Sequence, residues 1–226
     1  MGEHWIVVPR TARYYTLGEV SPATREVWVV LHGYAQLAEH FLRWFRPLDD
    51  GSRLIVAPEG LSRFYRAGAH GHVGASWMTA VDREAEIADY VGYLDAIADT
   101  LLRPTNDDSS GAEAPRLVVL GFSQGAATAA RWACRGRHPV DALVLWGGHV
   151  PPEIDLVQQR DRLRGLRLVL GSRDEYRDET ALARERGRLE AAAIVYEAID
   201  FDGTHRVESE PLMRMAASIR SEHVAP

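Results

Sequence analysis

A serine flanked by glycines is the residue of this sequence best suited to covalent chemistry. Gly121-Phe122-Ser123-Gln124-Gly125 fits the pattern G-x-S-x-G. The motif follows the apolar run Leu117–Leu120 and opens the small-residue helical pattern Gln124–Arg135. A sharp strand–turn–helix of this kind exposes the serine, and the glycines let strand and helix pass without Cβ clashes. We predict that Ser123 is a nucleophile; the alternative is a bystander serine in a buried turn.

A serine hydroxyl becomes a good nucleophile only when a base accepts its proton. After a strand–turn–helix nucleophile, the expected chain order is serine, acid, histidine. Among nine histidines, only His205 and His223 follow both Ser123 and a suitably distant acid. His223 stands near the C-terminus, whereas His205 follows the apolar run Val195–Phe201 directly. We therefore predict that His205 is the base rather than a surface loop histidine.

The acid that orients the base is predicted from its place after a strand. Asp174 follows the apolar run Leu166–Leu170 by a few residues, and catalytic groups of open α/β sheets collect at the carboxyl ends of strands. Asp174 is therefore preferred, with Glu175 as the first alternative. The remaining competitors are Asp178, Asp200 and Asp202.

Two backbone N–H groups are predicted to stabilise the oxyanion of a tetrahedral intermediate. One belongs to Gln124, the residue after the nucleophile, at the positive end of its helix. The other is expected from the loop after an early strand, where Gly33 permits a turn that aims the N–H of Tyr34 inward. His32, just before this glycine, is interpreted as a structural hydrogen-bonding residue rather than a catalytic one.

Short apolar runs alternate with longer amphipathic ones, which predicts a mostly parallel sheet with helices on both faces. The expected strands are Trp5–Val8, Arg13–Leu17, Val27–Leu31, Leu54–Ala57, Leu117–Leu120, Leu143–Trp146, Leu166–Leu170 and Val195–Phe201, the first two as an antiparallel edge ribbon. The expected helices are Arg83–Leu102, Gln124–Arg135, Asp178–Ala193 and Pro211–Arg220. Arg103–Arg116 is expected to be an exposed loop inside a single domain covering residues 1–226.

Composition excludes several other chemistries. All 26 basic residues are arginine, so no lysine is present to form a Schiff base, anchor pyridoxal phosphate or serve a P-loop. The single cysteine, Cys134, is interpreted as core filler, and a net charge of -6 disfavours nucleic acid as a partner. We expect no cofactor, no targeting segment, no membrane span and a cytoplasmic location. The sequence does not indicate an oligomeric state.

Weaker signals lie around the predicted site. Four aromatic residues stand beside motifs at strand ends, and as a group they suggest an aromatic-walled substrate pocket, although each also suits core packing: Trp77, Phe122, Trp146 and Tyr176. His70-Gly71-His72 alternates histidines in the manner of a metal site, but no cysteine or carboxylate nearby completes a ligand shell. The glycine-rich stretch Arg66–Gly74 is instead predicted to be a mobile loop bordering the pocket.

The motifs together resemble the phospholipase/carboxylesterase family of α/β-hydrolases, which are small serine esterases that include acyl-protein thioesterases. The matching pieces extend through most of the chain from Val27 onward: His32-Gly33-Tyr34, Ala57-Pro58-Glu59-Gly60, Ser76-Trp77-Met78, Arg83-Glu84-Ala85-Glu86-Ile87, Gly121–Gly125, Gly147-Gly148, Asp174 and Gly203-Thr204-His205. The resemblance implies an α/β-hydrolase fold, Ser123, Asp174 and His205 as a catalytic triad, and Tyr34 and Gln124 as oxyanion donors.

The sequence therefore predicts a serine carboxylesterase that hydrolyses small acyl esters through an acyl-enzyme. One alternative is an acyl thioesterase or lysophospholipase that acts on long acyl chains. Another, from a different class, is a hydrolase fold retained as a binding protein without catalysis.

Overall fold

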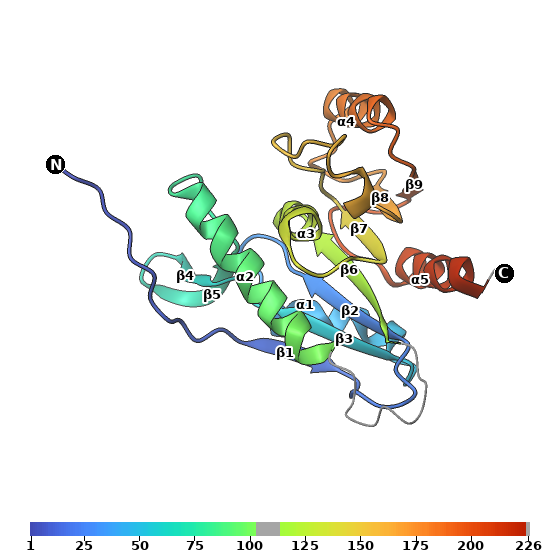
Figure 1. Cartoon of the computed structure of the whole chain (residues 1–226), viewed down its shortest axis with the longest axis horizontal. Helices are drawn as coiled ribbons and strands as arrows, with labels where there is room; N and C mark the ends of the chain where they lie inside the picture. The colour runs from blue at the N-terminus through green and yellow to red at the C-terminus, as the bar shows by residue number, and fades with distance from the viewer. Residues whose placement is uncertain (103–113, 225–226) are drawn as a thin grey trace.

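A seven-stranded sheet forms the centre of the computed structural model, which describes residues 1–102 and 114–224 (Figure 1). Its strands are β1 (Tyr14–Leu17), β2 (Glu26–Leu31), β3 (Arg53–Pro58), β6 (Arg116–Phe122), β7 (Ala142–Trp146), β8 (Leu166–Gly171) and β9 (Tyr196–Phe201). They lie in the order β1-β3-β2-β6-β7-β8-β9, and every neighbouring pair is parallel except β1 with β3. The predicted mostly parallel sheet is confirmed.

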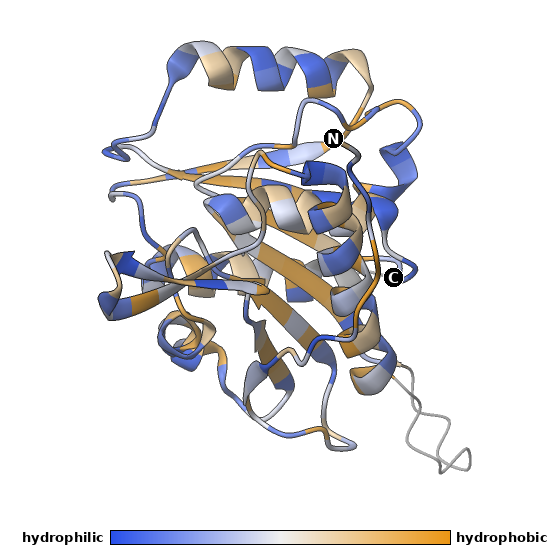
Figure 2. Ribbon diagram, turned by 90° about the vertical axis from the view of Figure 1, so that its left-hand side faces the viewer, coloured by the Kyte–Doolittle hydropathy of each residue, from blue (hydrophilic) through white to orange (hydrophobic). Residues whose placement is uncertain are grey.

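Helices cover both faces of this sheet. The helices α2 (Arg83–Leu101), α3 (Gln124–Arg135) and α4 (Glu179–Ala191) pack against one face, where Val27, Val29 and Leu31 of β2 point. The other face is covered by α1 (Ala38–Leu42), the 3-10 helix η1 (Arg43–Leu48) and α5 (Ser209–Val224). Alternate strand residues therefore enter two separate cores, so the central strands are apolar throughout (Figure 2).

Local sequence explains where the predicted helices begin. The Asp178 side chain accepts hydrogen bonds from the N–H groups of Thr180 and Ala181, at 2.9 and 3.2 Å, and so caps α4. Small residues along α3 let this helix lie close to β6 and β7. All four predicted helices are confirmed within a few residues of their ends. The short α1 and η1 were not predicted, and most of the predicted loop, residues 103–113, lies outside the described residues.

The predicted strand at Trp5–Val8 is wrong. These residues form an extended arm outside the sheet, and all four side chains are exposed. The edge position is taken by β1, which pairs with β3 from Tyr14 with Pro58 onward. At the start of β1, Arg13 Nε donates to the buried carboxylate of Glu59 at 2.7 Å. The arm thus has apolar residues of high strand propensity but pairs with none of the described strands.

The predicted mobile loop at Arg66–Gly74 is also wrong, because the chain there forms a β-hairpin. The strands β4 (Ser62–Ala67) and β5 (His70–Ser76) pair antiparallel, with an irregularity in register between Tyr65 and Ala67. Gly68 and Gly71 have φ angles of 64° and 99°, a region that glycine occupies without strain. The glycines therefore form a turn and a bulge of this hairpin instead of an irregular loop.

Candidate active site

Ser123 occupies a strained turn between β6 and α3. Its φ and ψ are 53° and -117°, values that are unfavourable for a residue with a Cβ. The flanking glycines make the turn possible. A Cβ on Gly121 would lie 2.1 Å from the carbonyl oxygen of Gly125, and a Cβ on Gly125 would lie 2.2 Å from that of Leu31. Because the backbones already touch, larger residues cannot replace these glycines without moving the turn.

Asp174 and His205 come together at the carboxyl ends of β8 and β9. The distance from His205 Nδ1 to Asp174 Oδ2 is 2.7 Å, and the Asp174 side chain is only 2% exposed. The other carboxylate oxygen, Oδ1, accepts the N–H of Tyr176 at 2.8 Å. Both oxygens therefore have a donor, as a buried carboxylate requires. The bond to Asp174 places a hydrogen on Nδ1 and leaves Nε2 of His205 able to accept a proton.

The other acids considered in the sequence are engaged elsewhere. Asp178 caps α4, Asp200 pairs with Arg177 Nη1 at 2.6 Å, and Asp202 pairs with Arg173 Nε at 2.9 Å. Glu175 is exposed. The geometry therefore favours Asp174 as the partner of His205.

The loop that carries His205 is fixed from two sides. Trp146 Nε1, at the end of β7, donates to the carbonyl of Arg206 at 3.0 Å. On the other side, the N–H of Arg173 donates to the carbonyl of Gly203 at 2.9 Å. The loops of the acid and the base are therefore held together by main-chain bonds, in addition to the bond between their side chains.

The segment after β7 lies between Ser123 and His205. The N–H of Ser123 donates to the carbonyl of Trp146 at 2.9 Å. A Cβ on Gly147 would lie 2.9 Å from Cε1 of His205, and a Cβ on Gly148 would lie 3.0 Å from the carbonyl oxygen of Ser123. The rings of His205 and Phe122, the residue before the serine, are 4.8 Å apart. Ser123 and His205 are thus neighbours across two glycines.

The Ser123 hydroxyl makes no hydrogen bond with any other described residue. In unliganded enzymes, the bond between nucleophile and base is often long and tightens only when substrate binds. The half-buried Ser123 and the adjacent imidazole are therefore compatible with a serine–histidine pair that forms around a substrate.

Tyr34 carries an N–H group without a protein acceptor among the described residues, whereas its neighbours are bonded. The N–H of Gly33 donates to Gln36 Oε1 at 2.8 Å, the N–H of Ala35 to the carbonyl of Ala75 at 2.9 Å, and that of Gln36 back to Gly33. The turn thus leaves one donor available. The Tyr34 ring is 60% exposed and stacks on Phe64 of the hairpin.

Gln124 also has an N–H that is unbonded among the described residues, while its side chain is fixed. Gln124 Nε2 donates to Ser76 Oγ at 3.0 Å and to the carbonyl of Met78 at 2.9 Å, and its Oε1 accepts the N–H of Trp77 at 3.2 Å. These bonds tie the start of α3 to the segment after β5. The N–H of Gln124 is therefore held in place at the positive end of a 12-residue helix.

The four aromatic residues expected at a pocket fall into two groups. Trp77 and Trp146 are buried in the two cores, where their indole N–H groups donate to the carbonyls of His32 and Arg206. Phe122 and Tyr176 instead flank the His205 ring, with Tyr176 72% exposed and its ring centroid 4.7 Å from that of the histidine. This placement favours packing for the two tryptophans and substrate contact for Tyr176.

His32 is a buried structural residue. Its Nδ1–H donates to the carbonyl of Gly33 at 2.8 Å, and its Nε2 accepts the N–H of Gly60 at 2.9 Å. Burial lowers the pKa of His32 to about 4. The ring is therefore neutral near pH 7 and joins the loop after β2 to the loop after β3.

The remaining sequence signals lie away from this chemistry. Among the described residues, no group of three histidine, cysteine, aspartate or glutamate side chains is placed to hold a metal ion; His70 and His72 are exposed on β5. Burial raises the pKa of the Cys134 thiol to about 11, so this cysteine is not a thiolate near pH 7. No described helix has the length and apolar character that a membrane crossing requires.

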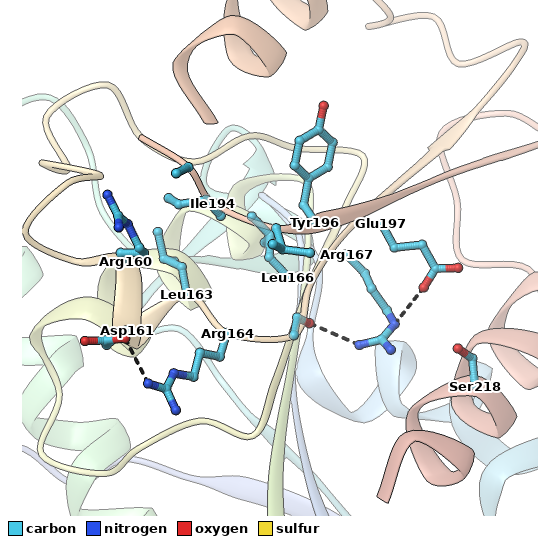
Figure 3. A pocket seen from close by; sticks show the side chains of 13 residues that line it. Arg160, Asp161, Leu163, Arg164, Leu166, Arg167, Ile194, Tyr196, Glu197 and Ser218 are labelled. Carbon is cyan, nitrogen blue, oxygen red and sulfur yellow. Dashed lines mark hydrogen bonds and ion pairs between the residues drawn. The ribbon is translucent and has the colours of Figure 1, made fainter. Parts of the chain in front are cut away.

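A cavity of about 670 Å³ opens at the amino ends of β8 and β9, opposite to Ser123 (Figure 3). Its charged side chains are already partnered: Arg164 pairs with Asp161 at 2.9 Å, and Arg167 pairs with Glu197 at 3.0 Å. Arg160 Nε donates to the carbonyl of Ala192. This cavity therefore offers no charged group prepared for a reaction.

Sequence reasoning missed the residues that support the loop of Tyr34, chiefly Phe64, Gly74 and Gln36. A Cβ on Gly74 would lie 2.6 Å from the carbonyl oxygen of Ala35, so the hairpin contacts this loop directly. The aromatic residue at Phe64 and the glycines that follow it were a signal for a hairpin.

The chain is similar to known proteins in its structure but not in its sequence. No protein-family model matches the chain, and no curated protein sequence matches it. Solved structures do. Esterase PE8 is similar with a TM-score of 0.65 and 19% identity, over 94% of this chain and 99% of the esterase. The chain has an α/β-hydrolase fold.

Two further hydrolase structures show the same similarity. Acyl-protein thioesterase 2 from Zea mays has a TM-score of 0.66 and 16% identity, over 93% of this chain and 99% of the thioesterase. A phospholipase/carboxylesterase from Dyadobacter fermentans has a TM-score of 0.61 and 15% identity, over 95% and 99% of the two chains. The resemblance seen in the motifs is therefore confirmed at the level of the hydrolase fold.

Proposed function

We propose that this protein is a serine ester hydrolase in which Ser123, His205 and Asp174 form the catalytic triad. The observation that carries the proposal is the buried Asp174–His205 pair, with its 2.7 Å bond, beside a serine held in a strained turn. If His205 were only a surface loop histidine, its buried carboxylate partner would be unexplained. If Ser123 were a bystander, its positive φ angle would be unexplained.

In the proposed reaction, Ser123 Oγ attacks the ester carbonyl while its proton moves to Nε2 of His205. Asp174 keeps the imidazole in the correct tautomer and stabilises the imidazolium. The N–H groups of Tyr34 and Gln124 donate to the oxyanion, each contributing roughly 3–4 kcal/mol of transition-state stabilisation. His205 then gives its proton to the departing alcohol, which leaves Ser123 acylated.

The second half of the cycle repeats the same steps with water. His205 accepts a proton from water as the water oxygen attacks the acyl carbonyl, and the tetrahedral intermediate then collapses. Ser123 recovers its proton from His205 as the carboxylic acid is released. This chemistry uses only side chains and main-chain donors of the chain itself.

The decisive experiment is the Ser123→Ala variant assayed with para-nitrophenyl acetate. We expect the rate to fall by several orders of magnitude, while the melting temperature stays close to that of the parent protein. Ser218→Ala on α5, at the opposite cavity, is the matched control and should keep full activity. A fluorophosphonate probe should label the parent and not the Ser123 variant. Unchanged turnover in Ser123→Ala would refute Ser123 as the nucleophile, and an unlabelled parent would favour a binding protein with a hydrolase fold.

A thioesterase or lysophospholipase that acts on long acyl chains is the second candidate. The structural similarity to an acyl-protein thioesterase favours it, and the same acyl-enzyme mechanism serves thioesters. Turnover of short and long acyl esters, each compared with the thioester of the same acid, separates the two candidates. Faster turnover of short oxygen esters supports the carboxylesterase, and faster turnover of long-chain thioesters supports the alternative.

A further inference from the structure

We infer that the β4–β5 hairpin places Arg66 at the mouth of the active site to recognise an ester that carries a carboxylate. This inference rests on the proposed function, because it concerns the substrate of the same site. It begins from the contact between the hairpin and the oxyanion loop, residues 33–36. Tyr34 stacks on Phe64 of β4, with ring centroids 5.3 Å apart and planes inclined by 28°.

The hairpin and the oxyanion loop form one continuous unit. Ala35 donates its N–H to the carbonyl of Ala75 at 2.9 Å, and Ala75 donates its N–H to the carbonyl of Gln36 at 3.0 Å. The absence of a side chain at Gly74 lets the backbone of Ala35 lie against β5. The oxyanion loop therefore lies directly on the hairpin face that carries Phe64.

Strand register puts one arginine side chain on that same face. Phe64 pairs with Gly74, and alternate residues of a strand share a face. The extra residue of the irregularity lies in β5, between Val73 and His70, so β4 keeps its alternation and Arg66 follows outward on the Phe64 face. Two residues of a strand span about 7 Å. A substrate whose carbonyl is bound near Tyr34 can thus present a distal group to Arg66 across the exposed tyrosine ring. Figure 1 shows the hairpin at the end of the sheet where β3 leads into it.

The charge of this region is opposite to that of the whole chain. The hairpin, residues 62–76, contains Arg63 and Arg66 and no aspartate or glutamate, although the chain has a net charge of -6 and Glu59 and Asp82 flank the hairpin. Arg66 is exposed and has no ion-pair partner among the described residues. Arg63, on the other face of β4, contacts Glu59 at 3.6 Å. Arg66 is therefore the arginine of the hairpin that is available to a carboxylate.

The test compares matched charged and neutral substrates. On the acyl side, the pair is the mono-para-nitrophenyl ester of adipic acid and para-nitrophenyl hexanoate, which differ by a terminal carboxylate. On the alcohol side, the pair is 4-carboxyphenyl butyrate and phenyl butyrate. The ratio of kcat/KM for the charged and neutral members is measured in the parent, in Arg66→Gln and in Arg63→Gln. Comparing these ratios between variants cancels the intrinsic reactivity of each ester.

We expect Arg66→Gln to lower the charged-to-neutral ratio of at least one pair by about two- to fivefold, the effect of an exposed ion pair. Its kcat/KM for the neutral esters should stay within about twofold of the parent, and high salt should lower the parent's ratio in the same way. Arg63→Gln, which removes the same charge from the opposite face, should keep the parent's ratio. The pair that responds identifies which side of the ester carries the carboxylate.

An unchanged ratio in Arg66→Gln, or an equal fall in Arg63→Gln, overturns the inference while ester hydrolysis itself stands. Failure of the parent protein to hydrolyse any of the four esters overturns the proposed function and this inference with it. The two failures are therefore distinguishable in one set of assays.

Discussion

The two ends of the sheet differ in how their polar groups are used. At the carboxyl ends of the strands, two main-chain N–H groups and the Ser123 hydroxyl have no partner among the described residues, and a buried carboxylate orients a histidine. At the amino ends of β8 and β9, a cavity of about 670 Å³ is lined by arginines that are already paired (Figure 3). The presence of a cavity alone would direct attention to the second end. The oriented groups without partners direct attention to the carboxyl ends of the strands instead.

The largest expected effect comes from Asp174→Asn at the carboxyl end. An amide cannot hold the His205 tautomer that accepts the serine proton, so kcat for para-nitrophenyl acetate should fall by about 10⁴-fold. Steady-state kinetics measure this loss. The control is Asp202→Asn, which removes an exposed carboxylate on the adjacent loop and should leave kcat within about twofold, as a surface change does. Similar losses in both variants would contradict the assignment of the acid.

The next effect concerns the close backbone contact beside Ser123. In Gly125→Ala, the new Cβ meets the carbonyl oxygens of Leu31 and His32 at 2.2 and 2.7 Å. The free energy of unfolding should therefore fall by about 3 kcal/mol, and activity should fall with it. The contrasting variant is Gly92→Ala in α2, where a Cβ meets nothing within 4 Å. It should gain about 1 kcal/mol from helix propensity. Denaturant unfolding of both variants tests the comparison, and a stable Gly125→Ala would disprove the steric account.

The buried His32 predicts a loss of stability at acid pH. Its pKa is about 4 in the folded protein and near 6.5 when unfolded, so the unfolded chain binds more protons between these values. The contribution of neutral His32 to the free energy of unfolding is complete above pH 6.5. It declines as the pH falls, and the loss reaches roughly 3 kcal/mol near pH 4. Unfolding free energies measured across this range should decline less steeply in His32→Gln. Equal slopes would show that His32 does not titrate on unfolding.

The smallest effect is expected at the opposite end. Arg164 is 74% exposed and pairs with an equally accessible Asp161. Arg164→Gln should change the unfolding free energy by less than about 0.5 kcal/mol and leave kcat/KM unaltered. Chemical denaturation and the para-nitrophenyl acetate assay measure the two quantities. A marked fall in activity would show that residues at the amino ends of the strands affect the site at the carboxyl ends, and would contradict the separation of the two ends.

The sequence predicted the central part of the fold because its signals are local. Apolar runs such as Val27–Leu31 and periodic ones such as Arg83–Leu102 each contain enough information to define an element. Trp5–Val8 has the same composition as a buried strand, yet it lies outside the sheet. Whether an apolar run becomes a strand depends on pairing with another segment, and on this side of the sheet β1 is the segment that pairs with β3. Local composition does not contain this information.

The sequence predicted those site residues that directly follow strands of the parallel sheet. Residues just after β2, β6, β8 and β9 meet because parallel strands end at one edge. The choice of Asp174 among five acids was narrowed by three-dimensional contacts, since its rivals are exposed, cap a helix or pair with arginines. The stacking of Phe64 on Tyr34 joins residues 30 positions apart, and no spacing rule predicts such a contact.

The packing around His205 has a consequence for how quickly the site can act. The imidazole lies among the Phe122 ring, the Tyr176 ring and the bare backbone of Gly147. A ring confined on several sides has lost its rotational freedom when the chain folds, so this entropy need not be lost again in each turnover. In the proposed mechanism, an encounter with substrate then begins with the imidazole already in place, and what remains to be ordered is the substrate and the hydrogen bond between Ser123 and His205.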